Sequence, residues 1–210
     1  DVVLPTESAK SVVLVGTGIE TDRLFTSVMT DHGKLGKSLA DAVIQGKAVK
    51  VGILSGNQSQ LGMRQRLKSV KDKLEEAGIE ISWILSEKEL DKKMRNVEYF
   101  AEHPVDTVIS LDNDDTEKAV DIILNDDSIS WKLYGEGRSE KLIYYLDKGT
   151  IQELAVPNEY YMGYQSIVLA AQNIRYYTDK TEQAEVEFYM VSKDNLYDEE
   201  TSRILFPAVR

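Results

Sequence analysis

The feature that most constrains the fold is a regular alternation of short apolar runs and longer amphipathic segments between residues 47 and 157. The apolar runs have the length of buried strands and cover residues 49–54, 79–85, 105–111, 129–134 and 151–156. The segments between them repeat their apolar residues at helical spacing and cover residues 61–76, 87–102, 113–124 and 139–148. Glycine or proline ends most of these segments, as at Gly78, Pro104 and Gly149. Strict alternation predicts an α/β fold with a three-layer parallel sheet carrying helices on both faces.

The flanking parts of the chain follow a looser rhythm. Ahead of the regular region we expect strands at 11–15 and 27–31 and a helix at 34–45 that ends at Gly46. Behind it we expect a longer helix at 160–177, a strand at 185–191 and an irregular polar tail at 192–210. The first ten residues have the pattern of an element whose partners lie upstream, so we expect the chain to begin within a fold.

Composition excludes several classes of function. The 210 residues carry a net charge of -11 and no cysteine. A nucleic-acid-binding surface needs a clustered basic face, so no nucleic acid is expected as a partner. The absence of cysteine excludes disulfides and zinc-cysteine sites. No apolar run approaches the roughly 20 residues that span a bilayer, and neither a metal site nor a cofactor is predicted.

A polar loop between two regular elements is the first candidate for a ligand site. The predicted strand 49–54 leads into Gly56-Asn57-Gln58-Ser59-Gln60, and a predicted helix follows with Arg64 and Arg66 near its start. In an open α/β sheet, loops beyond the carboxyl ends of the strands usually hold the ligand. We therefore expect this loop to face a small molecule.

Catalytic motifs find no support in the sequence. The segment 33–38 ends in Gly-Lys-Ser, but a phosphate loop needs glycine at position 31, which is Asp31. The segment 15–21 lacks the third glycine of a dinucleotide fingerprint because position 21 is threonine. No Gly-x-Ser-x-Gly elbow is present. The protein is therefore not expected to be an enzyme; a flavodoxin-like enzyme stays the third alternative, on sheet topology alone.

Several motifs together resemble the type I periplasmic binding protein family, whose fold is shared with the effector domains of LacI-type regulators. Residues 30–36, Thr-Asp-His-Gly-Lys-Leu-Gly, resemble the family's Ser-Asp-x-x-x-x-Gly helix start. Residues 62–66 resemble its Arg-x-Arg segment, and 104–108 with 112–114 resemble its Pro-x-hydrophobic-Asp strand and Asn-Asp loop. Ser-Lys-Asp-Asn at 192–195 resembles the signature of exported members. The motifs occur in the family's order along nearly the whole chain.

The resemblance implies two lobes that close on a ligand by a hinge. On that basis, residues 47–157 form lobe II, residues 1–46 and 158–191 form part of lobe I, and the tail 192–210 crosses back. The first strands of lobe I would be absent from this sequence, so the predicted fold is two-lobed and periplasmic-binding-protein-like, with the N-terminal part of lobe I missing.

The resemblance also implies ligand-binding residues in lobe II. Arg64 falls at the family's ligand-binding arginine, with pairing to a surface carboxylate as the alternative role. Asn113 falls at a ligand-binding asparagine, with helix capping as the alternative. Gln58 and Gln60 lie in the preceding loop, where solvation is the alternative.

Two positions depart from the family's usual set. The aspartate that sugar binders carry after the fourth strand of this lobe is replaced by Gly137, with Glu136 beside it. The usual amide residue of the crossover is replaced by Pro157, with Asn158 next. Glu136, Gly137 and Asn158 therefore complete the candidate ligand-binding set. Tyr160, Tyr161 and Tyr164 could stack on a sugar or belong to the core or rim.

The implied function is that of an extracytoplasmic solute-binding protein, periplasmic or lipid-anchored at the cell surface. It would bind a carbohydrate-like small molecule and present it to an ABC transporter or a sensor kinase in the membrane. The alternative is the effector-binding domain of a LacI-type transcriptional regulator.

Overall fold

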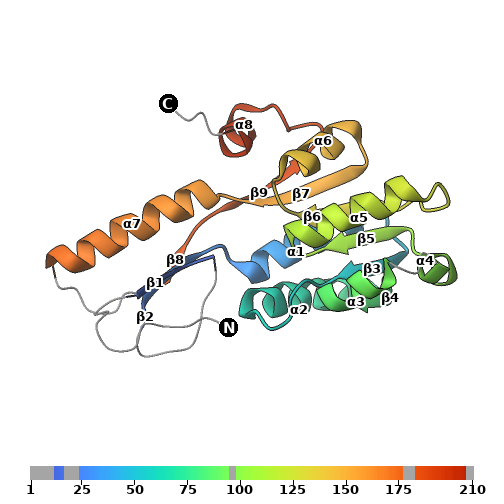
Figure 1. Ribbon diagram of the computed structural model, residues 1–210, viewed down its shortest axis with the longest axis horizontal. Coiled ribbons are helices and arrows are strands. Elements are labelled where there is room, and N and C mark those ends of the chain that lie inside the picture. The colour runs from blue at the N-terminus through green and yellow to red at the C-terminus, as the bar shows by residue number, and fades with distance from the viewer. Residues whose placement is uncertain (1–11, 17–23, 95–97, 177–182, 207–210) are drawn as a thin grey trace. The chain divides into compact units, whose positions relative to one another are not determined.

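The structure is a computed structural model that describes residues 12–16, 24–94, 98–176 and 183–206 (Figure 1). The chain divides into two compact units, which are described separately. The larger unit contains His32–Val156 and Phe188–Arg210, and the smaller unit contains Asp1–Asp31 and Pro157–Glu187. The regular alternation seen in the sequence lies in the larger unit.

A six-stranded sheet with the order β4-β3-β5-β6-β7-β9 forms the centre of the larger unit. Neighbouring strands from β4 to β7 pair in parallel, with Leu54 of β3 opposite Ser110 of β5 and Ser110 opposite Gly135 of β6. Their carboxyl ends therefore meet at one edge. The strands are β3 (Lys50–Leu54), β4 (Glu80–Leu85), β5 (Thr107–Ser110), β6 (Lys132–Glu136), β7 (Ile151–Pro157) and β9 (Phe188–Ser192).

Helices α1 (His32–Gln45) and α2 (Leu61–Glu76) cover one face of this sheet (Figure 1). Buried side chains of both helices, such as Leu39 and Val70, form one apolar cluster with Ile53 and Ile109 of the strands. Each helix presents its apolar residues on one side, which is the pattern of a helix that covers a sheet.

The other face of the sheet is covered by helices that contribute to a second cluster. These are α3 (Glu87–Lys93), α4 (Glu98–Glu102), α5 (Asn113–Asn125), α6 (Glu140–Lys148) and α8 (Glu199–Leu205). Trp83 and Trp131 pack in this cluster with ring centroids 6.1 Å apart. A Cβ atom at Gly52 would lie 2.1 Å from the Trp83 ring, so glycine there leaves room for the indole. Alternate residues of the strands enter the two clusters, and the predicted three-layer fold is confirmed.

The smaller unit holds a three-stranded sheet with the order β1-β2-β8 and one long helix. Val28, Met162 and Val186 form its buried cluster. Asn158 accepts a hydrogen bond from the backbone N–H of Tyr161 at 3.0 Å and so caps the helix. The elements are β1 (Val12–Val15), β2 (Leu24–Met29), β8 (Ala184–Glu185) and α7 (Glu159–Tyr176). Tyr160, Tyr161 and Tyr164 are exposed, so they do not belong to the core.

Three predicted elements differ from the structure. The expected helix at 87–102 is two helices, α3, which ends at Lys93 with Met94 as its C-cap, and α4, which begins at Glu98. The tail predicted to be irregular contains α8, whose Ile204 and Leu205 are buried in the second cluster. The expected strand at 185–191 is divided between β8 of the smaller sheet and β9 of the larger one.

The boundary between the units also differs from the predicted lobe boundary at residue 46. Helix α1 was assigned to lobe I with residues 1–46, whereas it packs with α2 in the larger unit. A Cβ atom at Gly36 of α1 would lie 2.6 Å from the backbone oxygen of Arg66, so the two helices are in very close contact. The division into lobes I and II itself stays a prediction.

Candidate functional site

The carboxyl ends of three neighbouring strands bring polar residues together in the larger unit. We define the carboxyl edge as the segments directly after β3 and β5 and the end of β6, that is residues 55–56, 111–113 and 136–137. The pairing of Leu54 with Ser110 and of Ser110 with Gly135 places these segments side by side. Such an edge is where open α/β sheets bind ligands.

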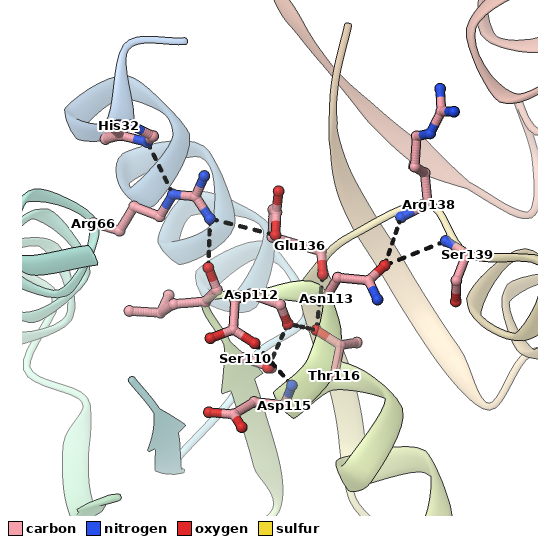
Figure 2. A network of polar contacts seen from close by, with 11 residues as sticks. His32, Arg66, Ser110, Asp112, Asn113, Asp115, Thr116, Glu136, Arg138 and Ser139 are labelled. Atoms are coloured by element: carbon pink, nitrogen blue, oxygen red, sulfur yellow. Dashed lines mark hydrogen bonds and ion pairs between the residues drawn. The ribbon is translucent and has the colours of Figure 1, made fainter. Parts of the chain in front are cut away.

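Arg66 of α2 is buried and reaches this edge, with an exposed fraction of 5%. Its Nη1 donates to the backbone oxygen of Leu111 at 2.5 Å and lies 3.4 Å from Oε2 of Glu136 (Figure 2). Its Nε donates to Nδ1 of His32 at 3.1 Å. A guanidinium has five donors in a fixed plane, and here three partners from three elements orient that plane.

The position of Arg66 follows from the spacing of the buried residues in α2. The buried positions are Gly62, Arg66, Val70 and Leu74, each four residues after the last. Residues four apart lie on one face of a helix, so the face that packs against α1 and the sheet carries this arginine. Burying a charge without partners is costly, which explains why Arg66 is paired with Glu136.

Glu136 lies at the end of β6, two residues beyond the strand 129–134 that the sequence predicts. Its exposed fraction is 8%, and it belongs to the strand. The preceding Gly135 is required for close packing, because a Cβ atom there would lie 2.6 Å from Cγ2 of Thr116. The Thr116 hydroxyl donates to the backbone oxygen of Asp112 or of Glu136, at 2.6 and 2.9 Å. Glycine here permits a close approach and does not mark a turn.

Two aspartates at the start of α5 form an acidic part of the edge. Asp112 is the N-cap, and its Oδ1 accepts the backbone N–H of Asp115 at 2.8 Å. Burial raises the pKa of the Asp112 carboxyl. Burial and then the charge of Asp112 raise the pKa of Asp115 to about 6, against the opposing effect of Lys118 at 3.4 Å. Asp112 is also close to the polar loop, since a Cβ atom at Gly56 would lie 2.2 Å from its Oδ2.

Asn113 and Gly137 are in direct contact. Oδ1 of Asn113 accepts the backbone N–H groups of Arg138 and Ser139 at 3.2 and 3.3 Å (Figure 2). Its Nδ2 donates to Oε1 of Glu117 at 3.2 Å. Gly137 has a φ of 139°, and a Cβ atom there would lie 2.6 Å from the same Oδ1. Asn113 therefore holds the loop between β6 and α6 at the carboxyl edge.

Arg64 lies on a different face of α2 from Arg66 and is exposed. Two residues of α-helix separate side chains by roughly 200°, so the two arginines cannot share one direction. Nη1 of Arg64 donates to the backbone oxygens of Gln58 and Ser59 at 3.1 and 2.9 Å. It thus fastens the polar loop to the helix, a role different from the surface ion pair considered above.

Gln58 and Gln60 lie in the same loop with different surroundings. The Gln58 amide nitrogen donates to the backbone oxygen of Ser55. Gln60 is exposed and occupies the N-cap position of α2 without a capping bond from its side chain. The remaining predicted residue, Asn158, belongs to the smaller unit, where it caps α7.

The structure thus brings Asn113, Glu136 and Gly137 together at the edge and adds Arg66, Asp112 and His32, which the sequence argument did not select. The four-residue spacing of buried positions in α2 could have identified Arg66. No signal in the sequence indicated that His32 would contact it.

The described part of the chain holds neither a metal site nor a membrane-spanning helix. Among the described residues, no three histidine or acidic side chains are placed to hold a metal ion. Within the same residues, no helix combines the length and apolar character needed to cross a membrane.

A parallel α/β unit with polar residues at the carboxyl ends of its strands is an architecture of ligand-binding proteins. Comparison with known families shows to which family of this class the chain belongs. The sequence model described as periplasmic binding protein domain matches residues 7–177. The chain therefore belongs to the periplasmic binding protein domain family, and the predicted resemblance is confirmed. No curated protein sequence matches the chain.

Solved structures share this fold at low sequence identity. A carbohydrate transporter solute binding protein from Agrobacterium radiobacter, in complex with D-arabinose, has a TM-score of 0.82 at 16% identity, covering 92% of this chain and 70% of that one. A glucose-galactose binding protein from Geobacillus stearothermophilus has a TM-score of 0.78 at 21% identity, covering 89% and 69%. A putative LacI transcriptional regulator from Bacteroides fragilis has a TM-score of 0.74 at 15% identity, covering 88% and 67%.

Proposed function

We propose that the protein is an extracytoplasmic solute-binding protein that recognises a sugar or a similar polar small molecule. It would present this ligand to an ABC transporter or to a sensor kinase in the membrane, without performing chemistry on it. Membership of the periplasmic binding protein domain family is the observation that carries this proposal. Sugar-binding transport proteins among the structural neighbours support it.

The carboxyl edge supplies groups suited to hydroxyl recognition. The Arg66 guanidinium has donors in a planar fork, and Glu136 and Asp112 offer carboxylate acceptors within the same group of side chains. A sugar hydroxyl is both donor and acceptor, so adjacent donors and acceptors can each take one of its roles. Asn113, Gly137, Arg64, Gln58 and Gln60 lie in the neighbouring loops and helix starts and stay proposed ligand residues, as does Asn158 of the smaller unit.

The charges of the edge favour a ligand without negative charge. Arg66 is neutralised by Glu136 at 3.4 Å, and the Asp112 carboxylate adds a further negative group. An anionic ligand would be repelled by the carboxylates and would have to compete with Glu136 for the guanidinium. A neutral polyol meets neither obstacle.

Binding of neutral sugars can be tested directly on the full-length protein. We expect a thermal-shift screen of neutral monosaccharides and polyols to raise the unfolding temperature, and the corresponding sugar acids to have no effect. Calorimetry should give a dissociation constant for the strongest hit. Stabilisation by the sugar acids and not by the neutral sugars would contradict the charge argument, and no stabilisation by any polar small molecule would contradict the function.

The alternative function is that of an effector-binding domain in a LacI-type regulator, supported by the Bacteroides fragilis structure. The genomic sequence upstream of Asp1 distinguishes the two. A signal or lipoprotein segment there is expected from the proposed function, whereas a helix-turn-helix segment would support the regulator. The Ser-Lys-Asp-Asn segment favours the exported class, and in the structure it forms a turn in which Asn195 accepts the Ser192 N–H at 2.8 Å.

A further inference from the structure

His32 is buried at the first position of α1 and faces Arg66 of α2 (Figure 2). The distance between Nε of Arg66 and Nδ1 of His32 is 3.1 Å. Arginine carries donors only, so the imidazole nitrogen must be the acceptor in this bond. His32 is therefore neutral, with its proton on Nε2 and a lone pair on Nδ1.

The three partners of Arg66 have separate roles. Leu111 and Glu136 both contact Nη1, at one corner of the guanidinium. His32 contacts Nε, at the other end of the group. Partners at one corner alone would leave the plane free to turn about that corner, whereas a second point of attachment at Nε fixes it.

The helix packing around this contact leaves little space for another arrangement. A Cβ atom at Gly62 would lie 2.5 Å from Nε2 of His32, and one at Gly36 would lie 2.6 Å from the backbone oxygen of Arg66. Glycines on both helices thus permit the close approach that brings the imidazole to the guanidinium. The close packing of α1 against α2 therefore fixes the position of this contact.

We propose that His32 is a positioning residue that fixes the orientation of the Arg66 guanidinium at the carboxyl edge by accepting its Nε–H. This role rests on the proposed function and deepens it, because the Arg66 guanidinium is there one of the groups that recognise the ligand. It makes His32 a determinant of binding geometry without contact to the ligand. The inference rests on the chemistry of the two side chains and on their burial.

The bond can be detected without any ligand. An N–H···N hydrogen bond transmits a scalar coupling between its two nitrogens, which nuclear magnetic resonance measures on ¹⁵N-labelled protein. We expect a coupling between Arg66 Nε and His32 Nδ1, and imidazole shifts of His32 typical of the Nε2–H form. The chain has only two histidines, and the exposed His103 serves as the internal reference. A His32 ring protonated at Nδ1 would overturn the proposal.

Substitutions separate a positioning role from a merely structural one. His32→Leu removes the acceptor, and we expect exchange of the Arg66 Nε proton with water to become roughly tenfold faster or more, as for the loss of one charge-assisted hydrogen bond. His32→Asn places an oxygen near the position of Nδ1 and should restore slow exchange. His103→Leu should leave this rate unchanged.

Unchanged exchange in His32→Leu, or equally fast exchange in His32→Asn and His32→Leu while both remain folded, would also overturn the proposal. If His32→Leu does not fold, His32→Asn and the coupling in the wild type still decide the matter. None of these measurements needs a bound sugar, so a failed ligand screen and a failed positioning role are distinguishable.

Discussion

Nη1 of Arg66 lies 3.4 Å from Oε2 of Glu136, and both side chains are almost entirely removed from solvent. One residue comes from a helix on one face of the sheet and the other from the end of a central strand. The pair therefore connects α2 to β6 at the edge where ligands bind in this type of fold. A change to this pair should therefore affect both the free energy of unfolding and the affinity for a ligand.

Breaking the Arg66–Glu136 pair from one side should destabilise the protein strongly. We expect Arg66→Met and Glu136→Gln each to lower the free energy of unfolding by about 3–5 kcal/mol, because the remaining group is left buried without its partner. The double variant Arg66→Met/Glu136→Gln should lose less than the sum of the two single variants. Urea unfolding measures all three.

The exposed pair Lys68–Asp72 on the same helix is the matched control. Its atoms are 2.6 Å apart, yet the side chains are 76% and 59% exposed. Lys68→Met should therefore lower the free energy of unfolding far less than Arg66→Met does. Equal losses for Arg66→Met and Lys68→Met would contradict the importance assigned to burial.

Asp115 should make the stability of the protein depend on pH. Its pKa is raised from 3.8 to about 6 in the folded protein. Below pH 3.8 the carboxyl is protonated in both states and its stabilising contribution is complete; that contribution is lost as the pH rises through about 6, because the buried group must ionise. Compared with Asp115→Asn, the wild type should lose at most about 3 kcal/mol between pH 4 and pH 7.

Asp106 should give the stability a pH dependence opposite in sign to that from Asp115. Although burial acts to raise the pKa of Asp106, hydrogen bonds from Thr107, Lys50 and Val49 outweigh it and lower this pKa. The contribution of Asp106 should therefore be present at neutral pH and be lost as the pH falls below 3.8. Thermal unfolding of Asp115→Asn, Asp106→Asn and the wild type across the pH range measures both contributions. A parallel pH dependence for Asp115→Asn and the wild type would refute the assignment for Asp115.

Gly137→Ala should be destabilising by about 1–3 kcal/mol. The position combines a φ of 139° with a Cβ site 2.6 Å from both Asn113 Oδ1 and Leu142 Cδ1. Gly163→Ala in α7 has open space at its Cβ position and should stabilise the protein by about 0.5–1 kcal/mol. Chemical denaturation of the two variants gives the comparison, and a Gly137→Ala variant at least as stable as the wild type would contradict the importance assigned to the backbone angle and the contacts at Gly137.

The two arginines of α2 should differ in their effect on sugar binding. Arg66→Lys keeps the charge but loses the planar fork, and we expect more than about a tenfold loss of affinity. Arg64→Ala removes an exposed side chain bonded to loop carbonyls and should cost less than about tenfold. Calorimetry with the strongest hit of the neutral-sugar screen measures both. A larger loss for Arg64→Ala would restore Arg64 as the principal ligand residue.

The order of strands and helices in the larger unit was predictable because local signals agree with the tertiary structure. Ser139 caps α6 and Gly149 ends it with a φ of 83°, both as their types suggest. These local signals did not predict features that depend on packing between residues far apart in the sequence. The predicted strand 129–134 stops before Gly135, whereas Gly135 is a strand residue that makes room for Thr116.

Local sequence patterns were also insufficient for the C-terminal tail and for part of the candidate site. Helix α8 is short, and the burial of Ile204 and Leu205 supports it, which a local pattern does not reveal. The motif predicts Arg64 as a ligand residue, which stays a prediction, and burial adds Arg66 at the edge. His32 contacts Arg66 across 34 residues of sequence, and no periodicity within one element could have indicated this contact.

The chain contains two tryptophans, and both lie in one apolar cluster of the larger unit. Intrinsic tryptophan fluorescence therefore reports on the larger unit alone, and changes confined to the smaller unit would be silent in that signal. Trp83 and Trp131 are 6.1 Å apart with their rings inclined at 57°, a geometry in which the two excited states interact. Circular dichroism should consequently show a signal of the indole pair that disappears when this cluster loosens, so the protein carries its own optical probe for one unit.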